Sequence, residues 1–149
     1  MSAGMSKVQQ VRGTAVISGL ASDAHTWNLV FLQLLLEELG YTVVNLGPCV
    51  PDELLVAECA RVRPALLVLS SVNGHGGQDA LRVIARLRAH PDLATLPAVV
   101  GGQLGVADDD AAQAAQLTAA GFDAVFPGGY DKLASFCRFV GAIGLAAAA

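Results

Sequence analysis

The sequence predicts a single α/β domain in which five parallel strands form a doubly wound sheet of order 2-1-3-4-5. Short apolar runs alternate five times with helical patterns along the 149 residues. The runs are continuously apolar, which is typical of a parallel sheet that helices cover on both faces. Five such units are too few for an eight-stranded barrel, and they suit a flavodoxin-like (Rossmann-like) order.

The first two βα units have clear beginnings and ends. Residues 14–20 are apolar and β-branched, which predicts a strand, and residues 27–39 have a helical pattern that a glycine closes. An apolar run over 41–47 predicts the second strand. The helix over 51–62 begins with Pro51 and two acidic residues, which suit the positive end of the helix dipole.

The other three units repeat this plan. Pro91 stops one helix, and Gly121 closes the next. We expect a folded domain over 14–142, a flexible tail over 1–13 and a frayed tail over 143–149. The remaining strands are predicted at 65–71, 97–102 and 122–129, and the remaining helices at 77–89, 108–120 and 130–142.

The composition limits what kinds of molecule this protein is expected to bind and where it is expected to work. The chain is 54% hydrophobic and 15% charged, with a net charge of -4. Such an apolar composition predicts a sheet buried on both faces, or a surface that meets a partner. The mild acidity argues against nucleic acid, and the longest apolar run is too short to span a membrane. Three cysteines without a CxxC pair, and no signal peptide, predict a reducing, cytoplasmic location.

Small residues and hydroxyls crowd the expected carboxyl ends of the strands. In an open parallel sheet, ligands bind outside these ends, at the switch point between the first and third strands. Glycine there lets the backbone approach a flat or bulky ligand. The sequence therefore predicts a binding slot at this edge. The residues that crowd it are Ser18-Gly19, Ser70-Ser71, Gly101-Gly102 and Gly128-Gly129.

Several common ligands of this fold do not match the sequence. A phosphoacceptor receiver needs an aspartate at the end of the third strand and a lysine at the end of the fifth. Here the third strand ends in Ser70-Ser71 and the fifth in Phe126-Pro127-Gly128. The GxGxxG and P-loop patterns are absent, and the three histidines are too widely spaced for a zinc pattern. A Cys–His nucleophile pair stays open, although no cysteine has an activating context.

Three spaced motifs carry a family resemblance. They are "DAH" at 23–25, "SSV" at 70–72 and "GG" at 101–102. Together they resemble the cobalamin-binding signature DxHxxG, SxL and GG. From about Ala15 to about Val140, the chain is similar to the small, cobalamin-binding subunits of glutamate mutase (methylaspartate mutase).

The resemblance implies adenosylcobalamin bound base-off and histidine-on. His25 would be the axial cobalt ligand, and Asp23 would accept a hydrogen bond from the other ring nitrogen. Ser70 would hydrogen-bond the buried base of the displaced nucleotide tail. The implied cofactor-binding residues are Ser22, Asp23, Ala24, His25, Trp27, Asn28, Ser70, Val72, Asn73, Gly101, Gly102, Gln103, Phe126, Pro127 and Gly128.

The chain departs from the signature at two positions. Asn28 stands where the signature has glycine, and Val72 where it has leucine. Asparagine tolerates a left-handed backbone better than most residues, and the bulky Trp27 precedes it. These two changes affect the expected binding of the cobalamin nucleotide tail more than the expected binding of cobalt by His25. His75 is expected near the rim of the corrin ring. An equally good interpretation is that His75 is an exposed residue of a surface loop.

The resemblance also implies an activity. The family catalyses the interconversion of L-glutamate and (2S,3S)-3-methylaspartate, a carbon-skeleton isomerisation driven by radicals from adenosylcobalamin. The catalytic residues would lie on a separate, barrel-shaped large subunit, so this chain alone would be inactive. One alternative is a stand-alone cobalamin carrier or sensor module. Another is a flavodoxin-like domain that binds a different ligand.

Two features have structural interpretations that stay open. Ser22 and Asp23 are good helix caps without any cofactor. The helix over 27–39 is apolar almost all round, which predicts a cover on more than one side. The cobalamin tail and a partner subunit are both candidates for that cover.

Overall fold

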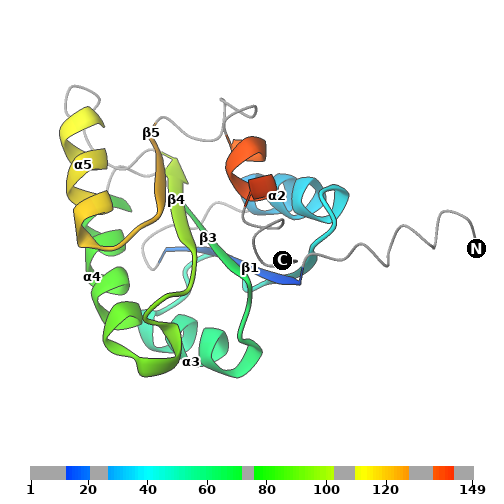
Figure 1. Ribbon diagram of the computed structural model, residues 1–149, viewed down its shortest axis with the longest axis horizontal. Helices are drawn as coiled ribbons and strands as arrows, with labels where there is room; N and C mark the ends of the chain where they lie inside the picture. The colour runs from blue at the N-terminus through cyan, green and yellow to red at the C-terminus, as the bar shows by residue number, and fades with distance from the viewer. Residues whose placement is uncertain (1–12, 21–26, 72–75, 103–109, 128–135, 143–149) are drawn as a thin grey trace, which may run out of the picture.

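The strands form one parallel sheet in the predicted order. The computed structural model of the protein describes residues 13–20, 27–71, 76–102, 110–127 and 136–142. Its sheet has the order β2-β1-β3-β4-β5 with parallel neighbours, which confirms the predicted fold class (Figure 1). The strands are β1 (Thr14–Gly19), β2 (Thr42–Asn45), β3 (Leu66–Ser71), β4 (Ala98–Gly102) and β5 (Ala124–Pro127).

The helices also lie where the sequence predicts them. Residues 136–142 are helical and fall within the last predicted helix; we call them the C-terminal helix. The predicted tails fall outside the described residues apart from Gly13, so that division stays a prediction. The other helices are α2 (Trp27–Glu38), α3 (Asp52–Val62), α4 (Gly76–Ala89) and α5 (Asp110–Ala120).

Two local details differ from the prediction. A short 3-10 helix, η2 (Pro91–Leu93), follows α4, because the His90 imidazole accepts a hydrogen bond from the Asp92 N–H (3.1 Å) and caps it. Strand β2 is shorter than the predicted 41–47. Its last strand residue is Asn45, whose side-chain oxygen accepts the Gly47 N–H (2.9 Å) and begins a turn there.

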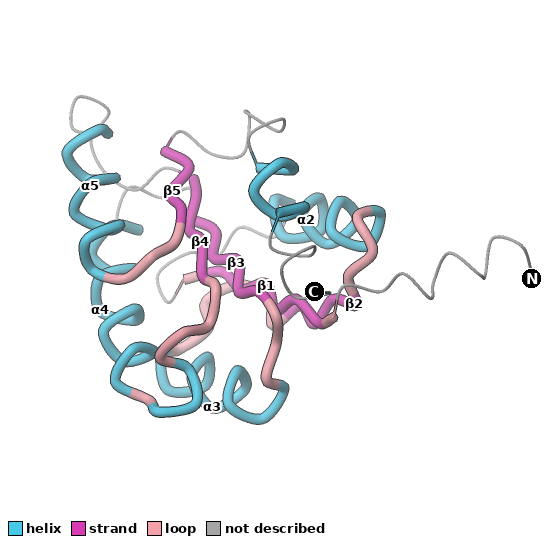
Figure 2. Tube along the Cα trace, in the orientation of Figure 1, coloured by secondary structure: helices cyan, strands magenta, loops and turns pink. Residues whose placement is uncertain are grey.

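Helices cover both faces of the sheet (Figures 1 and 2). Helices α3, α4 and α5 pack on one face, where Leu55, Ile84 and Leu117 are buried in a common core. Helix α2 and the C-terminal helix pack on the other face through residues such as Leu32 and Phe136. Among the described residues, no helix is long and apolar enough to cross a membrane.

Glycines end two of the helices. After α2, the Tyr41 N–H donates to the Leu36 carbonyl (3.0 Å), and the intervening Gly40 has a φ of 101°. After α5, Gly121 has a φ of 134° and holds the same position in the equivalent turn. Such a Schellman turn needs a left-handed residue, which glycine supplies without a Cβ clash. The two closing glycines predicted from the sequence are therefore helix ends.

Arg88 joins α4 to the amino edge of the sheet. Its guanidinium donates to the carbonyls of Gly121 (2.6 Å), Leu96 (2.7 Å) and Leu93 (3.0 Å). It also pairs with Asp123 (3.3 Å), whose carboxylate accepts the backbone N–H at the start of β4 (2.8 Å). One side chain thus satisfies carbonyls from two connecting segments.

Replacing Arg88 with alanine should lower the free energy of unfolding by about 2–4 kcal/mol, because several partly buried carbonyls lose a charged donor. Arg86→Ala is the matched control on the same helix. Its ion pairs with Glu53 (3.8 Å) and Asp52 (4.0 Å) are long, and its side chain is half exposed, so we expect a change within about 0.5 kcal/mol. Urea unfolding measures both variants, and equal losses would contradict the special role of Arg88.

Candidate functional site

One row of residues crosses the carboxyl edge of the sheet. Gly19 pairs with Ser70, Ser70 with Gly101, and Gly101 with Phe126; we call these four residues the edge row. Residues in register on parallel strands point to the same face, and so do residues two apart on one strand. Val68 precedes Ser70 by two and belongs to the core beneath α2. The edge row therefore faces α2 and the C-terminal helix.

The edge row is small at its centre and has one hydroxyl. Ser70 is 2% exposed, and the neighbours on either side of it, Gly19 and Gly101, have no side chain. No side chain therefore rises from the sheet on either side of the buried Ser70 hydroxyl. This arrangement suits close approach by a flat ligand group that has hydrogen-bonding atoms at its edge. The nearby Ser18 points to the opposite face and donates to the Gly19 carbonyl (2.9 Å).

Aromatic side chains close one end of the edge row. The Phe126 ring packs edge-on against Phe136 (centroids 5.5 Å apart) and Phe139 (6.5 Å) of the C-terminal helix. The Tyr41 hydroxyl donates to the Val140 carbonyl (3.1 Å) and ties the same helix to the start of β2. The C-terminal helix is therefore held at a fixed place beside the edge row.

The edge row lies at the topological switch point. From β1 the chain passes to α2 on one face, whereas from β3 it passes to α4 on the other. The two connections diverge at the carboxyl ends of β1 and β3, between which Gly19 and Ser70 are paired. Open α/β sheets bind their ligands in the crevice that such a divergence leaves.

The structure brings together some of the residues that the sequence singled out. Ser70, Gly101 and Phe126 share the edge row, and Gly102 pairs with Pro127 one residue further along. Trp27 and Asn28 begin α2. The predicted site residues that lie outside the described part of the chain are Ser22, Asp23, Ala24, His25, Val72, Asn73, His75, Gln103 and Gly128.

The sequence did not single out the turn after β2, which also reaches the carboxyl edge. The Gly19 N–H donates to the Gly47 carbonyl (2.9 Å), so the end of β1 is bonded to this turn. Cys49, two residues later, is exposed and has a φ of 54°, which costs a non-glycine residue on the order of 1 kcal/mol. The Gly47-Pro48 pair was the available signal, because such dipeptides mark turns.

An ion network joins the beginnings of α3 and α4 near this edge. Arg82 contacts the carboxylates of Asp52 (2.5 Å) and Asp79 (3.1 Å), whose side chains are largely buried. The hydrogen bond with Asp52 is the main reason that the pKa of Arg82 lies above its usual value. One cation therefore fixes the relative positions of two helix beginnings on the α3 and α4 face.

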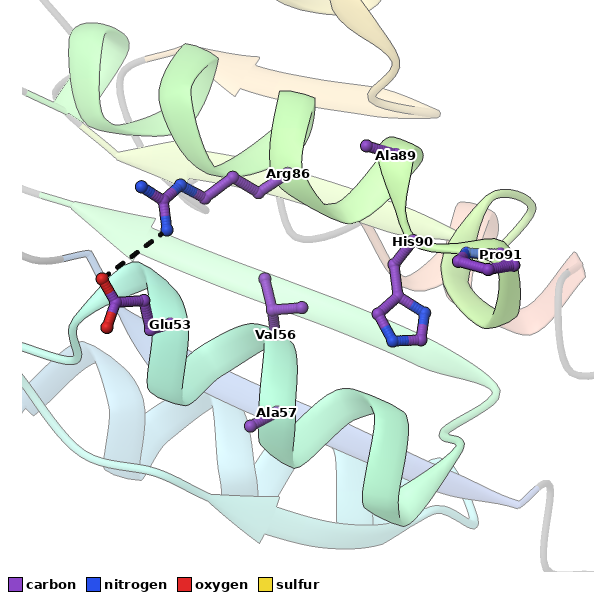
Figure 3. Close-up of a pocket in the computed structure, with 7 residues that line it drawn as sticks. All are labelled: Glu53, Val56, Ala57, Arg86, Ala89, His90 and Pro91. Atoms are coloured by element: carbon purple, nitrogen blue, oxygen red, sulfur yellow. Dashed lines mark ion pairs between the residues drawn. The ribbon is translucent and has the colours of Figure 1, made fainter.

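A groove on the α3 and α4 face is separate from the edge row. It has a volume of about 550 Å³ and lies beside the second half of α4, where the chain leads to the amino end of β4 (Figure 3). Arg86 and Glu53 pair with each other at one end of it, and His90 lies at the other. The lining residues are Glu53, Val56, Ala57, Arg86, Ala89, His90 and Pro91.

Comparison with known proteins identifies the family to which the chain belongs. The family model of the B12 binding domain matches residues 13–136. The chain belongs to this family. Similar relatives are the glutamate mutase sigma subunits of Halobacterium salinarum, 37% identical over 115 residues (76% of this chain, 75% of the relative), and Carboxydothermus hydrogenoformans, 30% identical over 115 residues (76% and 83%).

One solved structure that shares this fold is that of a cobalamin methyltransferase complex. The methanol:cobalamin methyltransferase complex MtaBC from Methanosarcina barkeri superposes with a TM-score of 0.70 at 22% identity. The match covers 91% of this chain and 47% of that chain, so the present chain spans about half the length of that protein. At this identity the likeness concerns the fold.

The cysteines differ sharply in their surroundings. Burial raises the pKa of the Cys59 thiol from 9.0 to about 12, and the charge of Glu58 adds to this. Cys49 is exposed. Cys59 therefore stays a protonated core residue at neutral pH, in agreement with the lack of an activating context in its sequence.

In the native protein, a thiol reagent should modify Cys49 quickly and Cys59 only after unfolding. Cys49→Ser should remove the fast phase, whereas Cys59→Ser should leave it intact. Because the folded pKa of Cys59 is raised, its contribution to stability is present below pH 9.0 and is lost as the pH rises toward about 12. Rapid modification of Cys59 in folded protein would contradict this assignment.

Proposed function

We propose that this chain is the cobalamin-binding subunit of a glutamate mutase, which works with a separate catalytic subunit. The observation that carries the proposal is the edge row, a buried serine between two glycines at the switch point of a B12-binding domain. The relatives named glutamate mutase sigma subunits, at up to 37% identity, supply the class of reaction.

The described residues fit a cofactor with a long nucleotide tail. Gly19 and Gly101 leave the sheet free of side chains beside Ser70, whose hydroxyl is a donor or acceptor for the tail base. Phe126, fixed by the aromatic contacts with the C-terminal helix, supplies an apolar wall at the end of the same row. The remaining predicted cofactor contacts at these strand ends are Val72, Asn73, Gly102, Gln103, Pro127 and Gly128.

The segment of sequence between β1 and α2 supplies the proposed cobalt ligand. His25 offers a neutral imidazole nitrogen to cobalt, and Asp23 accepts the hydrogen bond from the other nitrogen, which fixes the tautomer and raises the basicity of the ligand. The other predicted cofactor contacts in this part of the sequence are Ser22, Ala24, Trp27 and Asn28. Bound adenosylcobalamin would supply an organic radical through homolysis of its cobalt–carbon bond.

Substrate recognition belongs to the partner. At the described strand ends, the edge row and its neighbours are glycine, serine, phenylalanine and proline, which hold no charge for the carboxylates of an amino-acid substrate. The chain therefore orients the cofactor, and a catalytic subunit binds the substrate over it. A stand-alone cobalamin carrier or sensor remains the alternative. It predicts cofactor binding without turnover when the catalytic subunit is added.

Cobalamin in its Co(II) form, added to the purified protein, should give the absorbance and electron paramagnetic resonance spectra of a base-off, histidine-bound form. His25→Ala should abolish that form, and Asp23→Ala should weaken cofactor affinity by about 10–100-fold, since it removes the orienting partner. His90→Ala is the control, because His90 caps η2 away from the edge. A spectrum that His25→Ala leaves unchanged would refute the cobalt-ligand assignment.

Ser70→Ala should weaken cobalamin binding by roughly 5–30-fold, as expected for the loss of one buried hydrogen bond worth about 1–2 kcal/mol. Ser18→Ala is the matched control, a buried serine one residue from the edge row that points to the other face. Its affinity should stay within about two-fold of the wild type. Equal effects of the two substitutions would show that Ser70 acts on the fold and not on the cofactor.

A further inference from the structure

The outer face of α2 is apolar although it lies on the surface. The exposed fractions are 45% for Val30, 46% for Phe31 and 59% for Leu34; we call these residues the α2 patch. They lie on one stripe along the first two turns, since residues three and four apart are neighbours on a helix. The opposite side of the helix, including Leu32, is buried against the sheet.

The α2 patch has no counterpart in the described part of the chain. The other large apolar side chain with a similar exposure is Leu54 (48%), which stands singly on α3 beyond the opposite face of the sheet. A single exposed leucine is ordinary, whereas a contiguous apolar stripe marks a surface that meets another molecule.

The cobalamin tail does not account for this stripe. The edge row faces the inner side of α2, and the α2 patch lies on the outer side of the same helix. Of the two covers that the sequence suggested for this helix, the described geometry leaves a protein partner for the outer side.

The position of the α2 patch relates it to the cofactor edge. Helix α2 follows β1, whose carboxyl end is Gly19, and runs back toward the start of β2 (Figures 1 and 2). The patch lies along the first two turns of α2, the end of the helix that follows β1 in the chain. A protein that covers the cofactor from the carboxyl edge therefore needs only a short extension to reach it.

Charges at the far end of α2 indicate the chemistry of the partner. Glu37 and Glu38 are exposed in the last turn, which contains no basic residue. The carboxyl end of a helix carries a partial negative charge, to which these two carboxylates add. A cation on the surface of a partner would therefore be attracted by the carboxylates and by the helix dipole. A second copy of this chain fits poorly, because its net charge of -4 and its own α2 glutamates would meet like charge.

We propose that the α2 patch docks the catalytic subunit of the mutase, through an apolar depression bordered by lysine or arginine opposite Glu37 and Glu38. The inference rests on the proposed function, which requires such a subunit. The apolar stripe provides the buried centre of the interface, and the glutamates steer the encounter from its rim.

The test measures cofactor binding and subunit association separately. Cobalamin binding is followed by absorbance, and association of the loaded chain with a purified glutamate mutase catalytic subunit is measured by titration calorimetry. Phe31→Glu and Leu34→Gln should each weaken association by about 30-fold or more and leave cobalamin binding unchanged. Leu54→Gln, at a side chain of similar exposure on the other face, is the matched control and should change neither.

A charge test addresses the rim. Glu37→Gln combined with Glu38→Gln should slow association and reduce its dependence on salt, with little effect on dissociation. Circular dichroism confirms that each variant folds. If this double variant keeps the wild-type salt dependence, the basic border is refuted.

The outcomes separate the two proposals. A wild-type chain that fails to bind cobalamin overturns the proposed function together with this inference. Cobalamin binding combined with equal association of all variants overturns the inference alone. Cobalamin binding with no association of the wild type overturns the inference and also favours the stand-alone carrier over the proposed mutase subunit. Wild-type dimers in sedimentation that Leu34→Gln converts to monomers would assign the patch to a second copy and also overturn it.

Discussion

The parallel register that sets Ser70 between Gly19 and Gly101 is the constraint on which the candidate site depends. Backbone hydrogen bonds between strands fix this register, and buried apolar residues on both faces hold it in place. A slip of one residue in β3 would turn the Ser70 hydroxyl to the opposite face, because side chains alternate along a strand. The chemistry at the edge therefore depends on packing one and two residues earlier in each strand, in the rows that contain Leu69 and Val68.

The two faces of the sheet have different tasks. On the face of α3, α4 and α5, charged side chains fix the connections, with Arg82 between two helix beginnings and Arg88 at the amino edge. On the face of α2 and the C-terminal helix, contacts are apolar and aromatic, and the edge row leaves space at its glycines. A rigid first face allows the second to hold a large ligand, since a site is only as well placed as the elements that support it.

Helix α2 links the two proposals. Its inner side closes the core beside the edge row, its first residues follow the segment of sequence that contains His25, and its outer side presents the α2 patch. This explains why the helix is apolar almost all round, a pattern that a helix with one buried face does not need. In the proposed complex, one helix would contact both the cofactor site and the catalytic subunit, and would so fix their relative positions.

The sequence by itself determined the number and order of the strands and α-helices, because apolar runs, helix caps and closing glycines such as Gly40 and Gly121 are local signals. It also pointed to the carboxyl edge and to the B12-binding family through motifs that lie tens of residues apart. Only the tertiary structure decided the pairing of Ser70 with both glycines, the end of β2 at Asn45, the reach of Arg88 and which side of α2 meets solvent. These features arise from contacts between segments distant in the chain, and the relative placement of such segments is not encoded in any short stretch of residues.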